Sequence, residues 1–157
     1  MKSCLILTGG KLNLAFARSF LEKEHFDKVI AVDGGLESAE ALGITPDYIV
    51  GDFDTVSGEV ERFRNLPFIV WEQHKPEKNE TDTELARSRA LTLGCEKLVF
   101  LGATGGRLDH MLGNLHALYA CLEKGIDASL VDTQNRIYLL DQGKTFYRKT
   151  LWGKYVS

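Results

Sequence analysis

Short apolar runs recur along the first 131 residues, and stretches with helical spacing separate them. The runs are residues 4–7 (CLIL), 29–32 (VIAV), 48–50 (YIV), 68–71 (FIVW), 98–101 (LVFL) and 128–131 (ASLV). None shows the strict alternation of polar and apolar residues that is typical of a strand with one face in water. Strands of this kind, separated by helices, predict a parallel sheet covered by helices on both faces. The expected fold class is therefore α/β.

Helical patterns fill the intervals between these runs. Residues 12–21 and 108–122 carry apolar side chains at helical spacing, and a shorter helix is expected in 38–42. The polar stretch 56–65 is compatible with a helix. Thr81 and Glu84 form the S/T-x-x-E pattern of a capping box, which predicts a helix that continues to Gly94.

The pattern changes after residue 132. Residues 136–140 and 144–151 are expected to be strands joined by a turn at 141–143 (DQG), and no helical pattern follows them. We interpret residues 1–132 as one domain. Residues 133–157 are interpreted as the first hairpin of a second, all-β domain, most of which the chain lacks.

Composition excludes several classes of protein. Hydrophobic residues make up 44% of the chain and charged residues 26%, which is ordinary for a globular domain. The formal net charge of −3 argues against a general nucleic-acid binder, because phosphate neutralisation needs a basic surface. No apolar stretch approaches the length of a membrane span. The odd cysteine count, with no CxxC pair, favours reduced core thiols (Cys4, Cys95 and Cys121) and a cytoplasmic protein.

Acidic residues follow several of the predicted strands. Ligands of parallel sheets bind beyond the carboxyl ends of the strands, where Asp33, Asp52, Asp54 and Asp109 gather with Asp82 from the next helix. Carboxylates this close repel one another, so a positive group is expected among them. A hard divalent cation such as Mg²⁺ is the simplest candidate.

Asp52 and Asp54 are the strongest metal-ligand candidates, because residues i and i+2 of an extended segment point to the same side. The alternative for this pair is two loop aspartates that form Asx turns. Asp82 has an alternative as well, since acids in a first helical turn are favoured by the helix dipole.

The glycine-rich segment 102–106 (GATGG) precedes Arg107 and a helix, an arrangement that suits phosphate binding. His110 and Asn114 lie one turn apart and either face the pocket or form a structural pair. The chain contains no GxxxxGK[ST], no GxGxxG after a strand, no GxSxG and no HExxH. Its scattered histidines argue against a zinc site.

Taken in order, these motifs are specific. They are Asp33-Gly34-Gly35, then 51–55 (GDFDT), 78–82 (KNETD) and 105–110 (GGRLDH) followed by Asn114. In this order they closely resemble those of the thiamine pyrophosphokinases. The resemblance implies transfer of the pyrophosphoryl group of ATP to thiamine, giving thiamine diphosphate and AMP. It also implies a Rossmann-like catalytic domain, a following β-sandwich domain, and a homodimer with its sites at the subunit interface.

The resemblance also assigns roles to residues. Asp52, Asp54 and Asp82 correspond to Mg²⁺ ligands, and with Arg107 and Asp109 they form the implied catalytic set. Substrate contacts are implied for Asp33, Gly34, Gly35, Lys78, Thr81, Gly105, Gly106, His110 and Asn114. One residue departs from the family pattern, since Asn79 stands where the family usually has Asp. Asp109 and Asp82 both remain candidates for accepting the thiamine hydroxyl proton.

Two alternatives stay open at this stage. One is a catalytically inactive nucleotide-binding fragment, because most of the second domain is missing. The other is a haloacid-dehalogenase-like phosphatase, since 52–55 (DFDT) resembles the DxDx[TV] nucleophile motif of that family. Asp33-Gly34-Gly35 has no place in a phosphatase of that kind.

Overall fold

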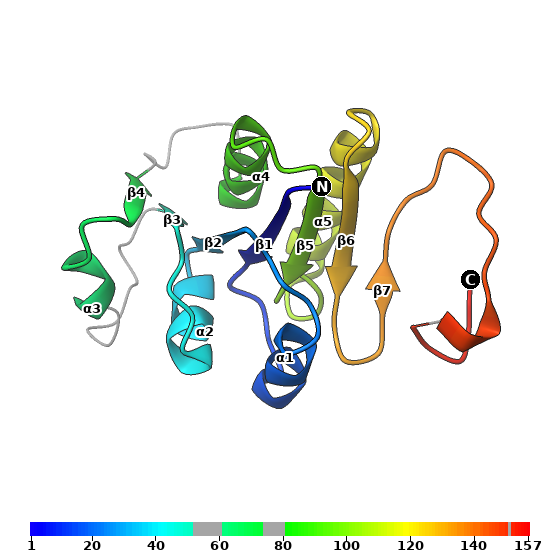
Figure 1. The fold of residues 1–157 in the computed structure, drawn as a ribbon, viewed down its shortest axis with the longest axis horizontal. Coiled ribbons are helices and arrows are strands. Elements are labelled where there is room, and N and C mark those ends of the chain that lie inside the picture. Colours follow the sequence, from blue (N-terminus) through cyan, green and yellow to red (C-terminus); the bar gives the residue numbers. More distant parts are fainter. Residues whose placement is uncertain (52–60, 74–80, 151) are drawn as a thin grey trace.

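The computed structural model describes residues 1–51, 61–73, 81–150 and 152–157 of the chain (Figure 1). It forms a seven-stranded sheet in the order β4-β3-β2-β1-β5-β6-β7. The strands are β1 Ser3–Leu7, β2 Lys28–Val32, β3 Tyr48–Gly51, β4 Val70–Gln73, β5 Lys97–Leu101, β6 Asp127–Val131 and β7 Arg136–Ile137. The helices are α1 Leu14–Leu21, α2 Gly35–Leu42, α3 Glu61–Arg64, α4 Asp82–Thr92 and α5 Leu108–Leu122, with a short 3₁₀ turn at Arg148–Thr150.

The sheet is parallel from β4 to β6, which confirms the α/β fold expected from the apolar runs. Strand β1 lies at its centre, pairing Leu5 with Val29 of β2 on one side and with Val99 of β5 on the other. Every residue of β1 is buried. A strand with neighbours on both edges and helices on both faces has no side in water, which explains why its sequence does not alternate.

Helices cover the two faces of the sheet. Cys4 and Ile6 of β1 pack in one apolar cluster with residues of α4 and α5. Leu5 and Leu7 point the other way, into a cluster with Ala17 and other residues of α1 and α2. The pleat of β1 thus divides the core into two layers, and Figure 1 shows α1 and α2 on one side of the sheet and α4 on the other.

The cysteines behave as expected from the sequence. Cys4, Cys95 and Cys121 are buried and free. Burial raises the pKa of each thiol, so the reactive thiolate is disfavoured at neutral pH. These residues serve the core.

Strand β4 differs from its prediction by two residues. The apolar run suggested 68–71, whereas the strand spans Val70–Gln73 and Phe68 is 64% exposed. Parallel pairing of Tyr48 with Val70 sets the register. Strand β4 lies at the edge of the sheet. Ile69, which comes just before it, packs in an apolar cluster with Phe63. Helix α2 also begins earlier than expected, at Gly35.

The predicted hairpin of residues 136–151 is wrong in the described residues. Strand β7 has only Arg136 and Ile137, it pairs antiparallel with β6 of the same sheet, and residues 138–150 contain no strand. An isolated two-stranded hairpin is marginal in water, so this segment gains more from packing elsewhere. The ring of Trp152 lies 6.1 Å from that of Phe16 and 5.9 Å from that of Phe20, both in α1. The division into domains at residue 132 stays a prediction.

No helix in the described ranges has the length and apolar character needed to cross a membrane.

Candidate active site

The strand order reverses at β1, where the chain first builds outward through β2, β3 and β4 and then returns to add β5 and β6. Such a reversal leaves a crevice at the carboxyl ends of the strands. A cavity of about 850 Å³ lies there. Its walls come from the loops after β1, β2 and β5 and from the first turns of α4 and α5, at residues 8–11, 32–34, 81–83, 102–103, 105–107, 109–110 and 113–114.

Asp33 stands where β2 ends and forms part of the acidic wall. Its φ is 44°, a left-handed conformation in which aspartate is enriched among the non-glycine residues. The carboxylate lies against Gly51, where an added Cβ would come within 2.0 Å of Asp33 Oδ1. Gly51 immediately precedes Asp52. The Asp33 carboxylate therefore lies next to the start of the segment predicted to bind the metal.

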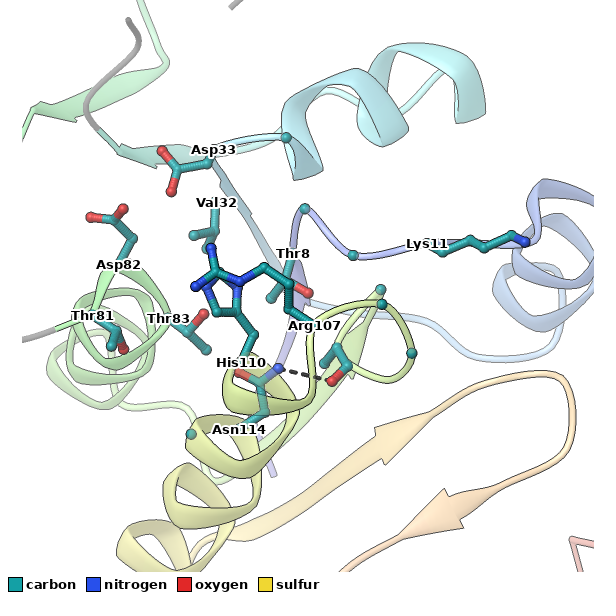
Figure 2. Close-up of a pocket in the computed structure, with 18 of the residues that line it drawn as sticks. Thr8, Lys11, Val32, Asp33, Thr81, Asp82, Thr83, Arg107, His110 and Asn114 are labelled. Atoms are coloured by element: carbon teal, nitrogen blue, oxygen red, sulfur yellow. Dashed lines mark hydrogen bonds between the residues drawn. The ribbon is translucent and has the colours of Figure 1, made fainter. Parts of the chain in front are cut away.

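Asp82 lines the same cavity from the first helical position of α4. Figure 2 shows the carboxylates of Asp33 and Asp82 on the same side of the pocket. Carboxylate oxygens are hard donors, and their chemistry fits Mg²⁺. No cluster of three or more Asp, Glu, His or Cys suitable for a metal occurs in the described part of the chain. Asp52, Asp54 and Lys78 lie outside the described residues, and so does Asn79.

Thr81 is the N-cap of α4. Its hydroxyl accepts a hydrogen bond from the Glu84 N–H at 3.2 Å, and the Glu84 carboxylate accepts one from the Thr81 N–H at 2.7 Å. The predicted capping box is therefore present. Thr81 also lines the cavity, but its hydroxyl holds the start of the helix that carries Asp82.

Arg107 and Asp109 form an ion pair on the cavity wall. Arg107 Nη2 lies 2.6 Å from Asp109 Oδ2, and Arg107 Nε lies 3.2 Å from Asp109 Oδ1. These hydrogen bonds raise the pKa of Arg107 and lower the pKa of Asp109. The His110 N–H also donates to Asp109 Oδ1. Because both side chains are exposed, water screens the pair, and a phosphate can compete for the guanidinium.

Asn114 lines the cavity but holds its wall. The side chain is buried, and Nδ2 donates to the carbonyl oxygen of Ala103 at 2.8 Å (Figure 2). Since Ala103 belongs to the glycine-rich loop after β5, the amide supports that loop from α5. His110 lines the cavity one turn earlier, as the sequence suggested.

A second support for this loop comes from Asp132, at the end of β6. Thr104 Oγ1 donates to Asp132 Oδ2 at 2.7 Å, and the N–H groups of Gln134 and Asn135 donate to Asp132 Oδ1. Partial burial alone would raise the pKa of Asp132, but these hydrogen bonds outweigh it and the pKa is lowered. The ionised carboxylate thus links the loop to the turn before β7.

Not all of the residues that line the cavity were proposed from the sequence. Residues 8–11 (TGGK), Thr83 and Gly113 line it without having been proposed. The signal was available, because Gly9 and Gly10 follow β1 at the same sheet edge as the other loops. Gly34, Gly105 and Gly106 do line the cavity. Gly35 is buried in α2 and is not among the lining residues, and its substrate contact stays a prediction.

Comparison with known proteins is consistent across sequence and structure. Residues 21–130 match the family model described as thiamin pyrophosphokinase, catalytic domain. The chain is 32% identical, over its whole length and 73% of the relative, to the thiamine pyrophosphokinase of Bacillus subtilis.

Solved structures give the same result. The crystal structure of thiamine pyrophosphokinase from Bacillus subtilis superposes with a TM-score of 0.71 at 30% identity, covering 87% of this chain and 63% of that one. Yeast thiamin pyrophosphokinase shares the fold, with a TM-score of 0.71 at 18% identity over 88% of this chain and 61% of that one. The chain thus spans less than two thirds of these crystallised proteins. The comparisons give no support to a phosphatase.

Proposed function

The chain belongs to the thiamin pyrophosphokinase family, and from this membership we propose that it transfers the pyrophosphoryl group of ATP to thiamine, giving thiamine diphosphate and AMP. The observation that best supports this activity is a single cavity with carboxylates on one wall and a glycine-rich loop with Arg107 on another. Acids suit a divalent cation, and backbone N–H groups with a guanidinium suit phosphate. Together they suit a nucleoside triphosphate and its divalent cation at the carboxyl ends of the strands.

The residues divide the chemistry between them. Asp52, Asp54 and Asp82 would hold Mg²⁺, which when bound would supply positive charge to offset that of the phosphates. The thiamine hydroxyl oxygen forms a bond to the β-phosphorus while the bond to the bridging oxygen of AMP breaks. Arg107, released from Asp109, stabilises the charge on the phosphate oxygens. Asp109, Asp82 or solvent then takes the hydroxyl proton.

In the part of the chain that the structure describes, the cavity at the carboxyl ends of the strands is lined by residues between Thr8 and Asn114. We therefore propose that residues 1–132 hold the nucleotide, and that a β-sandwich domain beginning after residue 132 completes the thiamine site. A reducing, cytoplasmic environment is proposed as well, since all three cysteines are free thiols.

A homodimer is the proposed assembly. On α5, Leu108, Leu112 and Tyr119 are 70%, 52% and 56% exposed, and their spacing places them along one side of the helix. This apolar stripe begins beside Arg107 at the cavity. We expect light scattering to give the mass of two chains, and Leu112→Asp to give the mass of one. A monomeric wild-type chain at micromolar concentration would contradict the dimer.

The identity of the nucleotide product tests the reaction. With ATP, Mg²⁺ and thiamine, we expect phosphorus NMR to show AMP and thiamine diphosphate in equal amounts. ADP as the product would indicate an ordinary kinase, and inorganic phosphate with an aspartyl-phosphate would indicate a phosphatase. Binding of ATP without any turnover would support the inactive nucleotide-binding fragment.

A further inference from the structure

Charge is unevenly distributed along the cavity. Asp33 and Asp82 lie on one side, and Arg107 in the middle is neutralised by Asp109. Lys11 lines the cavity from the loop after β1, and Figure 2 shows it on the other side, away from Asp33 and Asp82. The cavity therefore runs from an acidic end to a basic end.

Lys11 has no carboxylate partner among the residues that the structure describes. Two lysines in strands do have carboxylate partners. Lys28 pairs with Asp47 at 2.8 Å, and Lys97 pairs with Glu24 at 3.0 Å. The first turn of α1, which follows Lys11, carries no acidic residue. Among the described residues, no carboxylate therefore competes with an anion for the ammonium group of Lys11.

The backbone before Lys11 is held in place. An added Cβ on Gly10 would lie 2.0 Å from the carbonyl oxygen of Gly102, so the loop after β1 packs directly against the loop after β5. Lys11 follows Gly10 directly, so its backbone lies next to the glycine-rich loop. Figure 2 shows the Lys11 side chain extending away from Asp33, Asp82 and Arg107, and its flexible four-carbon stem lets the ammonium turn toward an anion bound beside the loop after β1.

We propose that Lys11 positions the nucleotide by binding the phosphate that stays with AMP. This inference rests on the proposed function. The acidic end of the cavity takes the metal and the two phosphates that are transferred, so the α-phosphate faces the basic end. When the bond between the β-phosphorus and the bridging oxygen breaks, its electron pair stays on AMP. A lysine there stabilises that charge and orients the leaving group.

Affinity measurements on Lys11→Gln test this role. By calorimetry with the 157-residue chain, we expect ATP and AMP each to bind about tenfold more weakly, as for the loss of one charged contact. Adenosine, which has no phosphate, should bind as it does to the wild type. Lys11→Arg should restore most of the affinity. Lys23→Gln, a change at an exposed lysine just after α1, is the matched control and should change nothing.

The outcomes separate the two proposals. Unchanged affinity of Lys11→Gln for AMP, in a chain whose wild type binds ATP, would overturn the role of Lys11 alone. Equal weakening for adenosine would overturn it as well, because the loss would not depend on phosphate. A wild-type chain that binds no ATP would overturn both this role and the proposed function.

Discussion

Asp82→Asn is expected to lower kcat/KM for thiamine diphosphate formation by at least about a hundredfold, the usual order for removing one preorganised electrostatic contact. Asp82 lines the cavity beside Asp33, at the first position of a helix fixed by the Thr81–Glu84 capping box. Asparagine keeps the shape and an oxygen donor but removes the charge. Initial rates at increasing Mg²⁺ concentrations, followed by AMP release, measure the effect. We expect a raised Mg²⁺ requirement as well as slower turnover.

A matched control separates this loss from damage to the fold. Asp127→Asn makes the same change at an exposed residue at the start of β6. The cavity lies at the other end of the strands. Asp127→Asn should leave kcat/KM within about twofold of the wild-type value. Asp82→Asn itself should lose only about 0.3–1 kcal/mol of stability, through its interaction with the helix dipole. Wild-type turnover in Asp82→Asn at limiting Mg²⁺ would remove Asp82 from the metal site.

The sheet was predictable because burial leaves a direct record in the sequence. Strands buried on both faces need apolar residues at every position, and β1 and β5 show this pattern without exception in 4–7 and 98–101. Once the strands are known to be parallel, their carboxyl ends must share one edge. That argument predicts Asp33, Asp82 and Arg107 at one edge of the sheet, and all three line the cavity there.

The two edge strands, β4 and β7, were less predictable, because each pairs with one neighbouring strand instead of two. Strand β4 pairs only with β3, so its register follows backbone pairing and not its most apolar residues. Strand β7 ends after two residues, and the chain then places Trp152 against Phe16 and Phe20. A local pattern does not report which distant surface a segment will contact.

The roles of individual residues were harder to predict from the sequence, because a polar side chain in a cavity can either contact the ligand or hold the surrounding backbone in place. Asn114 was proposed to contact substrate, and its amide donates to Ala103 of the glycine-rich loop. Thr81 was proposed in the same way, and its hydroxyl caps α4. The capping role of Thr81 was itself predictable from Glu84, whereas the hydrogen bond from Asn114 to the loop after β5 leaves no periodic signal in the sequence.

Gly35 shows the same distinction for a glycine. It was proposed as a substrate contact because it belongs to Asp33-Gly34-Gly35. The structure buries it at the start of α2, where an added Cβ would lie 2.0 Å from the carbonyl oxygen of Leu7 and 2.5 Å from the carbonyl carbon. Those atoms belong to the end of β1, at the centre of the sheet, and cannot move without disturbing its pairing.

Gly35→Ala is therefore expected to cost about 3 kcal/mol or more of the free energy of unfolding, at the upper end of overpacking effects. Alanine is otherwise favoured over glycine inside a helix, so the backbone contact alone sets the sign. Gly113→Ala is the control, since it adds the same methyl group within α5, where no atom lies within 4 Å. It should gain about 0.5–1 kcal/mol from helix propensity. Urea unfolding followed by circular dichroism measures both variants. Equal stability of Gly35→Ala and wild type would mean that α2 does not pack this closely on β1, and that Gly35 is free to serve the ligand instead.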